Sequence, residues 1–240
     1  MAKIFRYELK RLTMNRFFFG LLAITLVYGF MLLSGDIIIG VAYTAPFSGW
    51  SYGMFMVRMQ PLLLVALLFF VSFLYAKQEK SVKQLTFATP VNPRTYALVK
   101  CAAIAVGYVV IAIAAVLVSF IFYGVVFRFY GFGDFVAPML LTLIPGMLFV
   151  LGVGMIAGGI HPGLIYTAMA GVFAVDMLPM PMFFGIMGGR FFSEFPLLLP
   201  VGAGGEPYFY VPIIFLLGRV LLGGLGILMV CVGVRGYAKL

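Results

Sequence analysis

Six long apolar runs constrain this chain more than any other feature of its sequence. They lie at about residues 17–33, 52–76, 101–123, 136–157, 164–180 and 211–234. A helix that rises 1.5 Å per residue needs about 20 residues to cross ~30 Å of hydrocarbon, and each run is close to that length. The chain is 64% hydrophobic and 10% charged, far from the composition of a soluble domain. The sequence therefore predicts an all-α membrane protein with six transmembrane helices, forming a single transmembrane domain over residues 1–240.

The basic residues are distributed so that they orient these runs. Twelve of the 16 lysines and arginines lie before the first run, between the second and third runs, or after the last run. The other connections carry most of the acids and only two basic residues: Asp36, Asp134, Glu194, Glu206, Arg128 and Arg190. Because lysine and arginine are retained on the cytoplasmic side, we expect a multi-pass protein with both termini and segment 77–100 in the cytoplasm. The net charge of +9 then reports orientation, and we expect no nucleic-acid partner.

Residues 1–16 precede the first run and have an amphipathic pattern. Phe5, Leu9 and Leu12 recur at helical spacing. Basic residues occupy another face of the same helix: Lys3, Arg6 and Lys10. This pattern predicts a helix that lies in the membrane interface, with a solvated basic tail as the alternative. The stretch lacks a good small-residue cleavage site, so we expect it to be retained.

Segment 77–100 is a polar stretch between the second and third apolar runs. It reads KQEKSVKQLTFATPVNPRTYALVK and holds five basic residues, one acid and two prolines. Proline suits the start of a helix and not its interior, so Pro90 and Pro93 are expected to end one helix and start the next. The result would be a compact turn at the membrane surface. An ordinary basic loop that obeys the orientation rule is the alternative interpretation.

The order of residues in this segment favours a more specific interpretation. An acid, a threonine-containing stretch, a proline, a basic residue and a lysine follow one another: Glu79, Thr86, Pro90, Arg94 and Lys100. This order resembles the cytoplasmic coupling segment of ABC-2 type transporter permeases. Members of that family also have an interfacial N-terminal helix, six spans and a short re-entrant outer segment between the last two spans. Residues 180–210 fit such a segment, because they are too apolar for a free loop and too broken by glycine and proline for a full span.

The resemblance implies a permease subunit of an ATP-driven exporter in a bacterial plasma membrane. Two such subunits, identical or different, would bind two cytoplasmic ATPase subunits, and the segment between spans two and three would dock into each ATPase. ATP and magnesium would then be bound by the ATPase and not by this chain, for which no cofactor of its own and no enzymatic activity are expected. The substrate is left open.

The motifs of other function classes are missing from the sequence. Nothing matches the phosphate-binding pattern G-x-x-x-x-G-K-[ST], the nucleophile elbow G-x-S-x-G or the metal-binding pair H-E-x-x-H. His161 is the only histidine, and no cluster of metal-ligating residues is visible. Two alternatives to the permease stay open: a membrane scaffold or sensor subunit that transports nothing, and an ion-coupled carrier. A carrier would be expected to show internal repeats and more polar sites inside its spans.

Three charged residues fall inside the apolar runs: Arg58, Asp176 and Arg219. Charged side chains at that depth tend to face a cavity or a partner. Asp176 lies ~18 Å along the fifth span from its cytoplasmic start, and Arg219 lies ~12 Å below the outer start of the sixth, so their depths coincide in a ~30 Å core. We expect Asp176 to pair with Arg219 or, failing that, with Arg58. Such a pair could hold an outer gate shut or only fix the packing.

Overall fold

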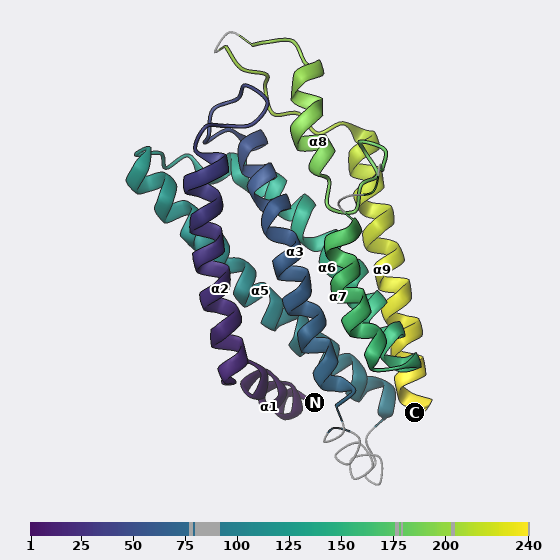
Figure 1. The fold of residues 1–240 in the computed structure, drawn as a ribbon. Coiled ribbons are helices and arrows are strands. Elements are labelled where there is room, and N and C mark those ends of the chain that lie inside the picture. The colour runs from purple at the N-terminus through teal and green to yellow at the C-terminus, as the bar shows by residue number, and fades with distance from the viewer. Residues whose placement is uncertain (77–78, 80–91, 176–177, 179, 203–204, 240) are drawn as a thin grey trace.

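The computed structural model describes residues 1–76, 79, 92–175, 178, 180–202 and 205–239 (Figure 1). Helix makes up 79% of the structure, and the described residues contain no strand. The α-helices are α1 (Ala2–Thr13), α2 (Arg16–Leu32), α3 (Gly49–Leu74), α5 (Pro93–Val126), α6 (Val136–Ile160), α7 (Gly163–Val175), α8 (Gly189–Glu194) and α9 (Ile213–Lys239). Short helical turns extend α2 (Leu33–Ile37), precede α6 (Phe132–Phe135) and follow α8 (Phe195–Leu198). The predicted all-α class is confirmed.

Within the described residues, five helical segments are long and apolar enough to cross a membrane. They are Arg16–Ile37, Gly49–Leu74, Pro93–Val126, Phe132–Ile160 and Ile213–Ala238. These segments indicate a multi-pass membrane protein. The fifth apolar run, expected as a full span over 164–180, forms the shorter helix α7 of 13 residues. At 1.5 Å per residue α7 is about 20 Å long. Residues 176, 177 and 179 of that run lie outside the described residues.

Polar side chains fix the starts of three of these helices. The side-chain oxygens of Asn15, Ser48 and Asn92 accept hydrogen bonds from backbone N–H groups in the first turns of α2, α3 and α5. Such N-caps satisfy donors that have no partner within the helix. Pro93 occupies the first turn of α5, where proline is favoured, and its predicted role as a helix start is confirmed. Because the cap and not hydropathy sets this boundary, α5 begins well before the apolar run at 101 and includes Lys100.

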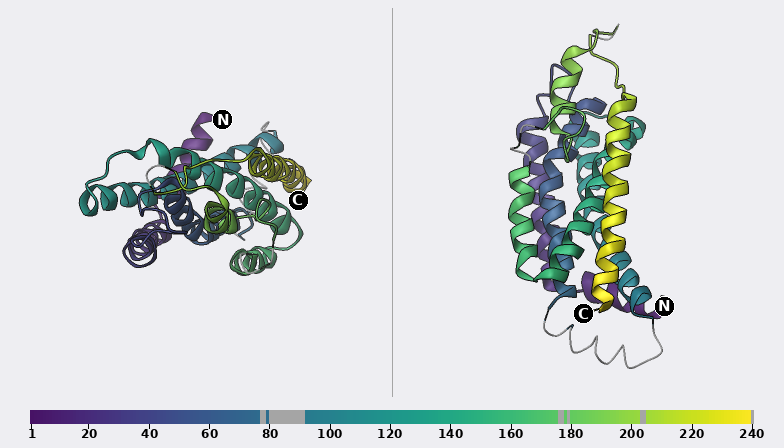
Figure 2. Two further views of the ribbon diagram at one scale, coloured as in Figure 1. Left: turned by 90° about the horizontal axis from the view of Figure 1, so that it is seen from above. Right: turned by 90° about the vertical axis from the view of Figure 1, so that its right-hand side faces the viewer.

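The two chain termini lie at the same end of the bundle, which we call the terminal end (Figure 1). Helix α1 lies across this end, at a steep angle to α2 (Figure 1). The C-terminal end of α3 and the start of α5 are also found here. The opposite end, which we call the far end, carries α8 and the connections around it (Figures 1 and 2).

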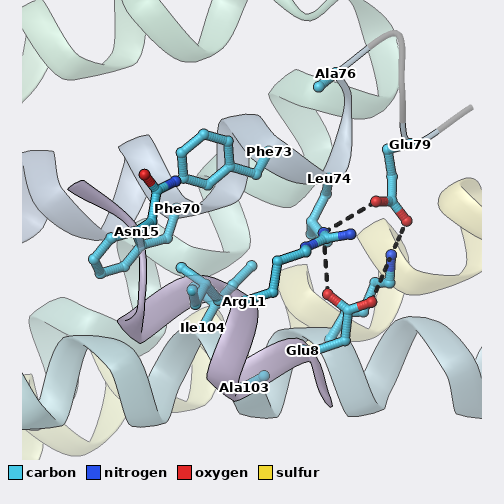
Figure 3. A pocket seen from close by; sticks show the side chains of 12 residues that line it. Glu8, Arg11, Asn15, Phe70, Phe73, Leu74, Ala76, Glu79, Ala103 and Ile104 are labelled. Atoms are coloured by element: carbon cyan, nitrogen blue, oxygen red, sulfur yellow. Dashed lines mark hydrogen bonds and ion pairs between the residues drawn. The ribbon is translucent and has the colours of Figure 1, made fainter. Parts of the chain in front are cut away.

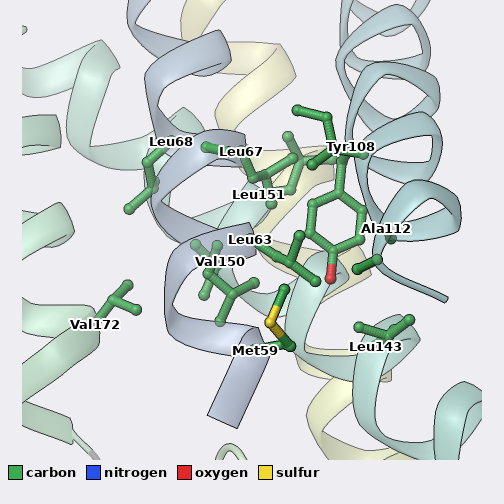
Figure 4. Close-up of a cluster of buried hydrophobic side chains, with 14 of the residues drawn as sticks. Met59, Leu63, Leu67, Leu68, Tyr108, Ala112, Leu143, Val150, Leu151 and Val172 are labelled. Carbon is green, nitrogen blue, oxygen red and sulfur yellow. The ribbon is translucent and has the colours of Figure 1, made fainter. Parts of the chain in front are cut away.

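Helix α3 forms the centre of the bundle. In its most apolar 18-residue window 67% of the residues are buried, compared with 22% for α9. Its buried apolar side chains, such as Leu63, share one core with buried side chains of α5 and α6, such as Tyr108 and Leu151 (Figure 4). The glycines of α6 allow close approach: a Cβ at Gly158 would lie 2.2 Å from the Tyr75 ring. Small residues thus serve packing within the chain here.

Candidate functional site

Four charged side chains meet at the terminal end of the bundle (Figure 3). Glu8 and Arg11 belong to α1, Glu79 follows the end of α3, and Lys100 lies in the first turns of α5. We call this group the four-charge cluster. It joins three elements that are distant in sequence, and it contains two of the residues that the polar segment was predicted to contribute.

Ion pairs run around the whole cluster. Arg11 Nη2 lies 3.0 Å from Glu8 Oε2 and 3.0 Å from Glu79 Oε2. Lys100 Nζ lies 3.5 Å from Glu8 Oε1 and also pairs with Glu79 Oε1. The Tyr96 hydroxyl donates a 3.4 Å hydrogen bond to Glu79 Oε1, and the Lys100 ammonium lies 4.6 Å from the centre of the Tyr96 ring. Two carboxylates and two cations therefore balance one another.

Three of the four side chains are removed from solvent. The exposed fractions are 5% for Glu8, 3% for Glu79 and 1% for Lys100. A buried charge is tolerated when it is paired and hydrogen-bonded, whereas a single unpaired one is strongly destabilising. Removing a single member would leave an unbalanced buried charge, and the pairs join α1 and residue 79 to α5.

The sequence of α1 explains how an acid comes to lie inside this end. Glu8 is on the same helical face as Phe5 and Leu12, three positions before it and four after it. Leu12 is buried, and Phe5 and Leu9 are half-buried against the core. The basic residues Lys3, Arg6 and Lys10 are exposed. The amphipathic helix predicted for residues 1–16 is present, and its apolar face packs on the bundle.

A cavity of about 330 Å³ adjoins the cluster. The charged side chains form one wall, and Phe70, Phe73 and Ile104 from α3 and α5 contribute an apolar wall (Figure 3). Asn15, at the junction of α1 and α2, also borders it. This space lies between α1 and the helices it rests on, so α1 is not packed tightly against them along its whole length.

The residues predicted for coupling fall into three groups. Glu79 and Lys100 are brought together and buried. Arg94 is exposed, two residues after the cap of α5. Thr86 and Pro90 lie outside the described residues.

Sequence reasoning did not single out Glu8 or Arg11 of this cluster. A signal was present, because Glu8 is the only acid before Asp36 and lies on the apolar face of an otherwise basic helix.

The charged residues predicted inside the spans have different surroundings. Arg58 forms an ion pair with Asp36 near the far end, and both side chains are exposed. Arg219 is 3% exposed, donates a 2.7 Å hydrogen bond to the Ile186 carbonyl, and lies over the Phe215 ring. Its Nε and Nη2 have no hydrogen-bond partner within the described part of the chain. Asp176 lies outside the described residues, so its pairing with Arg219 stays a prediction.

The segment predicted to be a re-entrant element packs on the far end of the bundle. In α8, Phe191 stacks on Phe215 of α9 with ring centres 3.8 Å apart, and both rings are fully buried. Trp50 of α3 donates a 3.1 Å hydrogen bond to the Pro207 carbonyl. Glu206 accepts one of 2.9 Å from the backbone N–H of Ala45. These contacts explain why so apolar a stretch is not a free loop.

No protein-family profile, no curated protein and no solved structure matches this chain. Among the described residues there is also no group of three or more histidine, cysteine, aspartate or glutamate side chains that could hold a metal ion.

Proposed function

We propose that this chain is the permease subunit of an ATP-driven exporter of the ABC-2 type, working in a bacterial plasma membrane. In this proposal segment 77–100 is the docking element for a separate cytoplasmic ATPase, which binds ATP and magnesium. A second permease subunit, identical or different, completes the transporter.

The four-charge cluster is the observation that carries this proposal. A segment that receives force from a soluble partner must pass it to the membrane helices. Glu79 and Lys100, at the two ends of the polar segment, are paired with each other and with Glu8 and Arg11. Displacement of the segment would therefore act directly on α1, α3 and α5.

The position of the termini supports six crossings and a cytoplasmic terminal end. Both termini lie at one end of the bundle, which requires an even number of crossings (Figure 1). Five helical segments of the described residues are long enough to span, and α7 belongs to the sixth crossing in this proposal. The terminal end also carries the basic residues of α1 together with Arg94 and Lys100, in agreement with retention of lysine and arginine in the cytoplasm.

Burial divides the predicted coupling residues into two roles. Glu79 and Lys100 are covered by the chain itself, so in this proposal they position the segment. Arg94 is exposed at the start of α5 and is the described residue best placed to contact the ATPase.

A site-specific cross-linking experiment tests this proposal. A photoreactive amino acid replaces Arg94 at the terminal end or, as the control, Tyr130, which is exposed beyond the other end of α5. Irradiation of native membranes should join the Arg94 variant, and not the Tyr130 variant, to an ABC-type ATPase that mass spectrometry identifies. A scaffold or carrier would give no ATPase adduct at either position. Adducts at Tyr130 alone would contradict the proposed orientation.

A further inference from the structure

A second cavity, of about 180 Å³, lies between α3, α6 and α7. Figure 4 shows Val172 of α7 facing Leu68 of α3 and Val150 of α6 across this space. Ile186 and Met187, from the segment that leads to α8, close it at the far end. The cavity is partly open to the outside, and α7 lies at the periphery of the bundle (Figure 2).

The sequence of α7 explains why this space exists. The residues that line the cavity recur at helical spacing along one face: Ala168, Gly171, Val172 and Val175. Two of the four, Ala168 and Gly171, are the smallest residue types, and their side chains leave the space towards α3 and α6 unfilled. A Cβ built on Gly171 would meet no atom within 4 Å.

The chemistry of the lining selects an apolar occupant. The cavity walls consist of aliphatic and aromatic side chains, and a buried water needs two to four polar partners. An apolar cavity of about 150 Å³ takes up one benzene molecule, so the present cavity is sized for a single hydrocarbon chain or ring. Two helices that border it, α3 and α6, are long enough to span a membrane, and a bilayer supplies acyl chains at this depth.

The positively charged side chain of Arg190 borders a small pocket that adjoins this cavity. Val175, Ile186 and Met187 also line an adjoining pocket of about 30 Å³, and Arg190 lies at that pocket. Arg190 uses three of its five N–H groups in described hydrogen bonds, two of them in an ion pair with the Glu194 carboxylate and one to the Met180 carbonyl. The remaining N–H groups suit a phosphate oxygen.

We propose that this cavity binds one acyl chain of an anionic membrane phospholipid, with the lipid phosphate at Arg190. The site is separate from the four-charge cluster and does not depend on the proposed transport function. Its occupant fills the space that the small residues of α7 leave open and holds α7 against α3 and α6.

Photo-cross-linking in vesicles tests this proposal. The purified full chain is placed in phosphatidylcholine vesicles with a small fraction of phosphatidylglycerol that carries a diazirine on one acyl chain. Peptide mass spectrometry then locates the adducts. We expect adducts on residues 168–175 that saturate as the probe fraction rises, whereas adducts on the exposed Leu228 of α9 rise in proportion to the probe.

Substituted variants make the test specific. Gly171→Leu fills the cavity, and displacing about two methylenes of the lipid chain weakens binding roughly tenfold. Gly224→Leu is the matched control, because a Cβ there also meets no atom within 4 Å but Gly224 does not line the cavity. Arg190→Gln should lower labelling by the phosphatidylglycerol probe to the level of an uncharged diacylglycerol probe. Ala168→Leu replaces Gly171→Leu if that variant does not fold.

Three outcomes overturn the proposal in whole or in part. Adducts on residues 168–175 that never saturate would show ordinary contact with bulk lipid. Saturable labelling that the two cavity-filling variants leave unchanged would place the bound chain elsewhere. Equal labelling by both probes in the wild type, with no effect of Arg190→Gln, would show that Arg190 does not bind the lipid phosphate and would overturn the proposed lipid class.

Discussion

Glu79 and Lys100 form a buried ion pair that closes the two ends of the polar segment onto each other. Arg11 and Glu8 of α1 complete the group from the other side. The chain between the two paired residues therefore starts and ends at one fixed point. A partner that moves this segment would move α1 and α5 with it.

The charge balance of the cluster predicts an asymmetric response to mutation. Lys100→Met leaves two buried carboxylates with one cation, and breaking a buried pair costs about 3–5 kcal/mol of unfolding free energy. The double variant Glu79→Gln/Lys100→Met restores the balance and should recover part of this loss. Thermal unfolding of the purified protein in one detergent measures both. Arg94→Met, an exposed residue of the same segment, should leave the midpoint unchanged. A double variant less stable than Lys100→Met alone would contradict the balanced cluster.

The same cluster predicts how firmly α1 is held. Glu8→Gln weakens the pairs to Arg11 and Lys100, so α1 should detach more often from the bundle. A cysteine at the buried position Leu12 reports this detachment through its rate of labelling by a water-soluble maleimide. We expect a several-fold faster rate with Glu8→Gln and no change with Lys3→Gln, which alters an exposed charge of the same helix.

This labelling experiment uses a background in which Cys101 and Cys231 are replaced by alanine. Equal labelling rates in all variants would show that the apolar face of α1, and not the cluster, holds the helix in place.

The sequence predicted the elements of this fold well because hydropathy decides them. Membrane-spanning helices must be apolar and of a set length, so four of the six runs were placed within a few residues at both ends. The start of α5 was displaced, because Asn92 and Pro93 begin the helix before the apolar run does. The length of the fifth span stays a prediction, because α7 is described as far as Val175 and residues 176, 177 and 179 of that run lie outside the described residues.

The candidate site was only half predictable, for a physical reason. The order of residues in the polar segment drew attention to Glu79 and Lys100. Their partners lie on α1, and which side chains meet there depends on how α1 folds back across the bundle, a tertiary relationship that local patterns do not contain. The one sign in the sequence was that Glu8 lies on the apolar face of α1, where a carboxylate needs a charged partner from another helix.

The contact between α6 and α9 makes a prediction about packing. A Cβ at Gly226 would lie 2.5 Å from the backbone of Leu148 and Phe149, so Gly226→Ala must push the two helices apart. Overpacking of this kind costs about 1–3 kcal/mol. Gly224→Ala adds the same methyl group two residues away, where nothing lies within 4 Å, and should be tolerated. The midpoints of thermal unfolding of both variants in one detergent check this. Equal midpoints would show that the helices adjust without cost.

Arg219 makes the last prediction, because its buried guanidinium needs a further partner. It donates one hydrogen bond to the Ile186 carbonyl, while Nε and Nη2 have none among the described residues. A Cβ at Gly188 would lie 2.0 Å from Nη2, so the backbone of the outer segment rests directly on this charge. From the sequence we expect Asp176 to lie at the same membrane depth as Arg219, so Asp176 is the acid that we expect to complete the pair. Arg58 has its own partner in Asp36, which makes it the weaker candidate.

A double-mutant cycle with Asp176→Asn and Arg219→Gln tests this pairing. A buried charge without a partner is strongly destabilising, so each single change should lower the yield of folded protein more than the double change does. Arg58→Gln is the control: in place of Arg219→Gln in the same cycle it should give additive effects with Asp176→Asn. Additive effects for Asp176 and Arg219 would end the hypothesis. A non-additive result confined to folding yield would assign the pair to packing, whereas one that also appears in transport activity would assign it to an outer gate beneath Gly188.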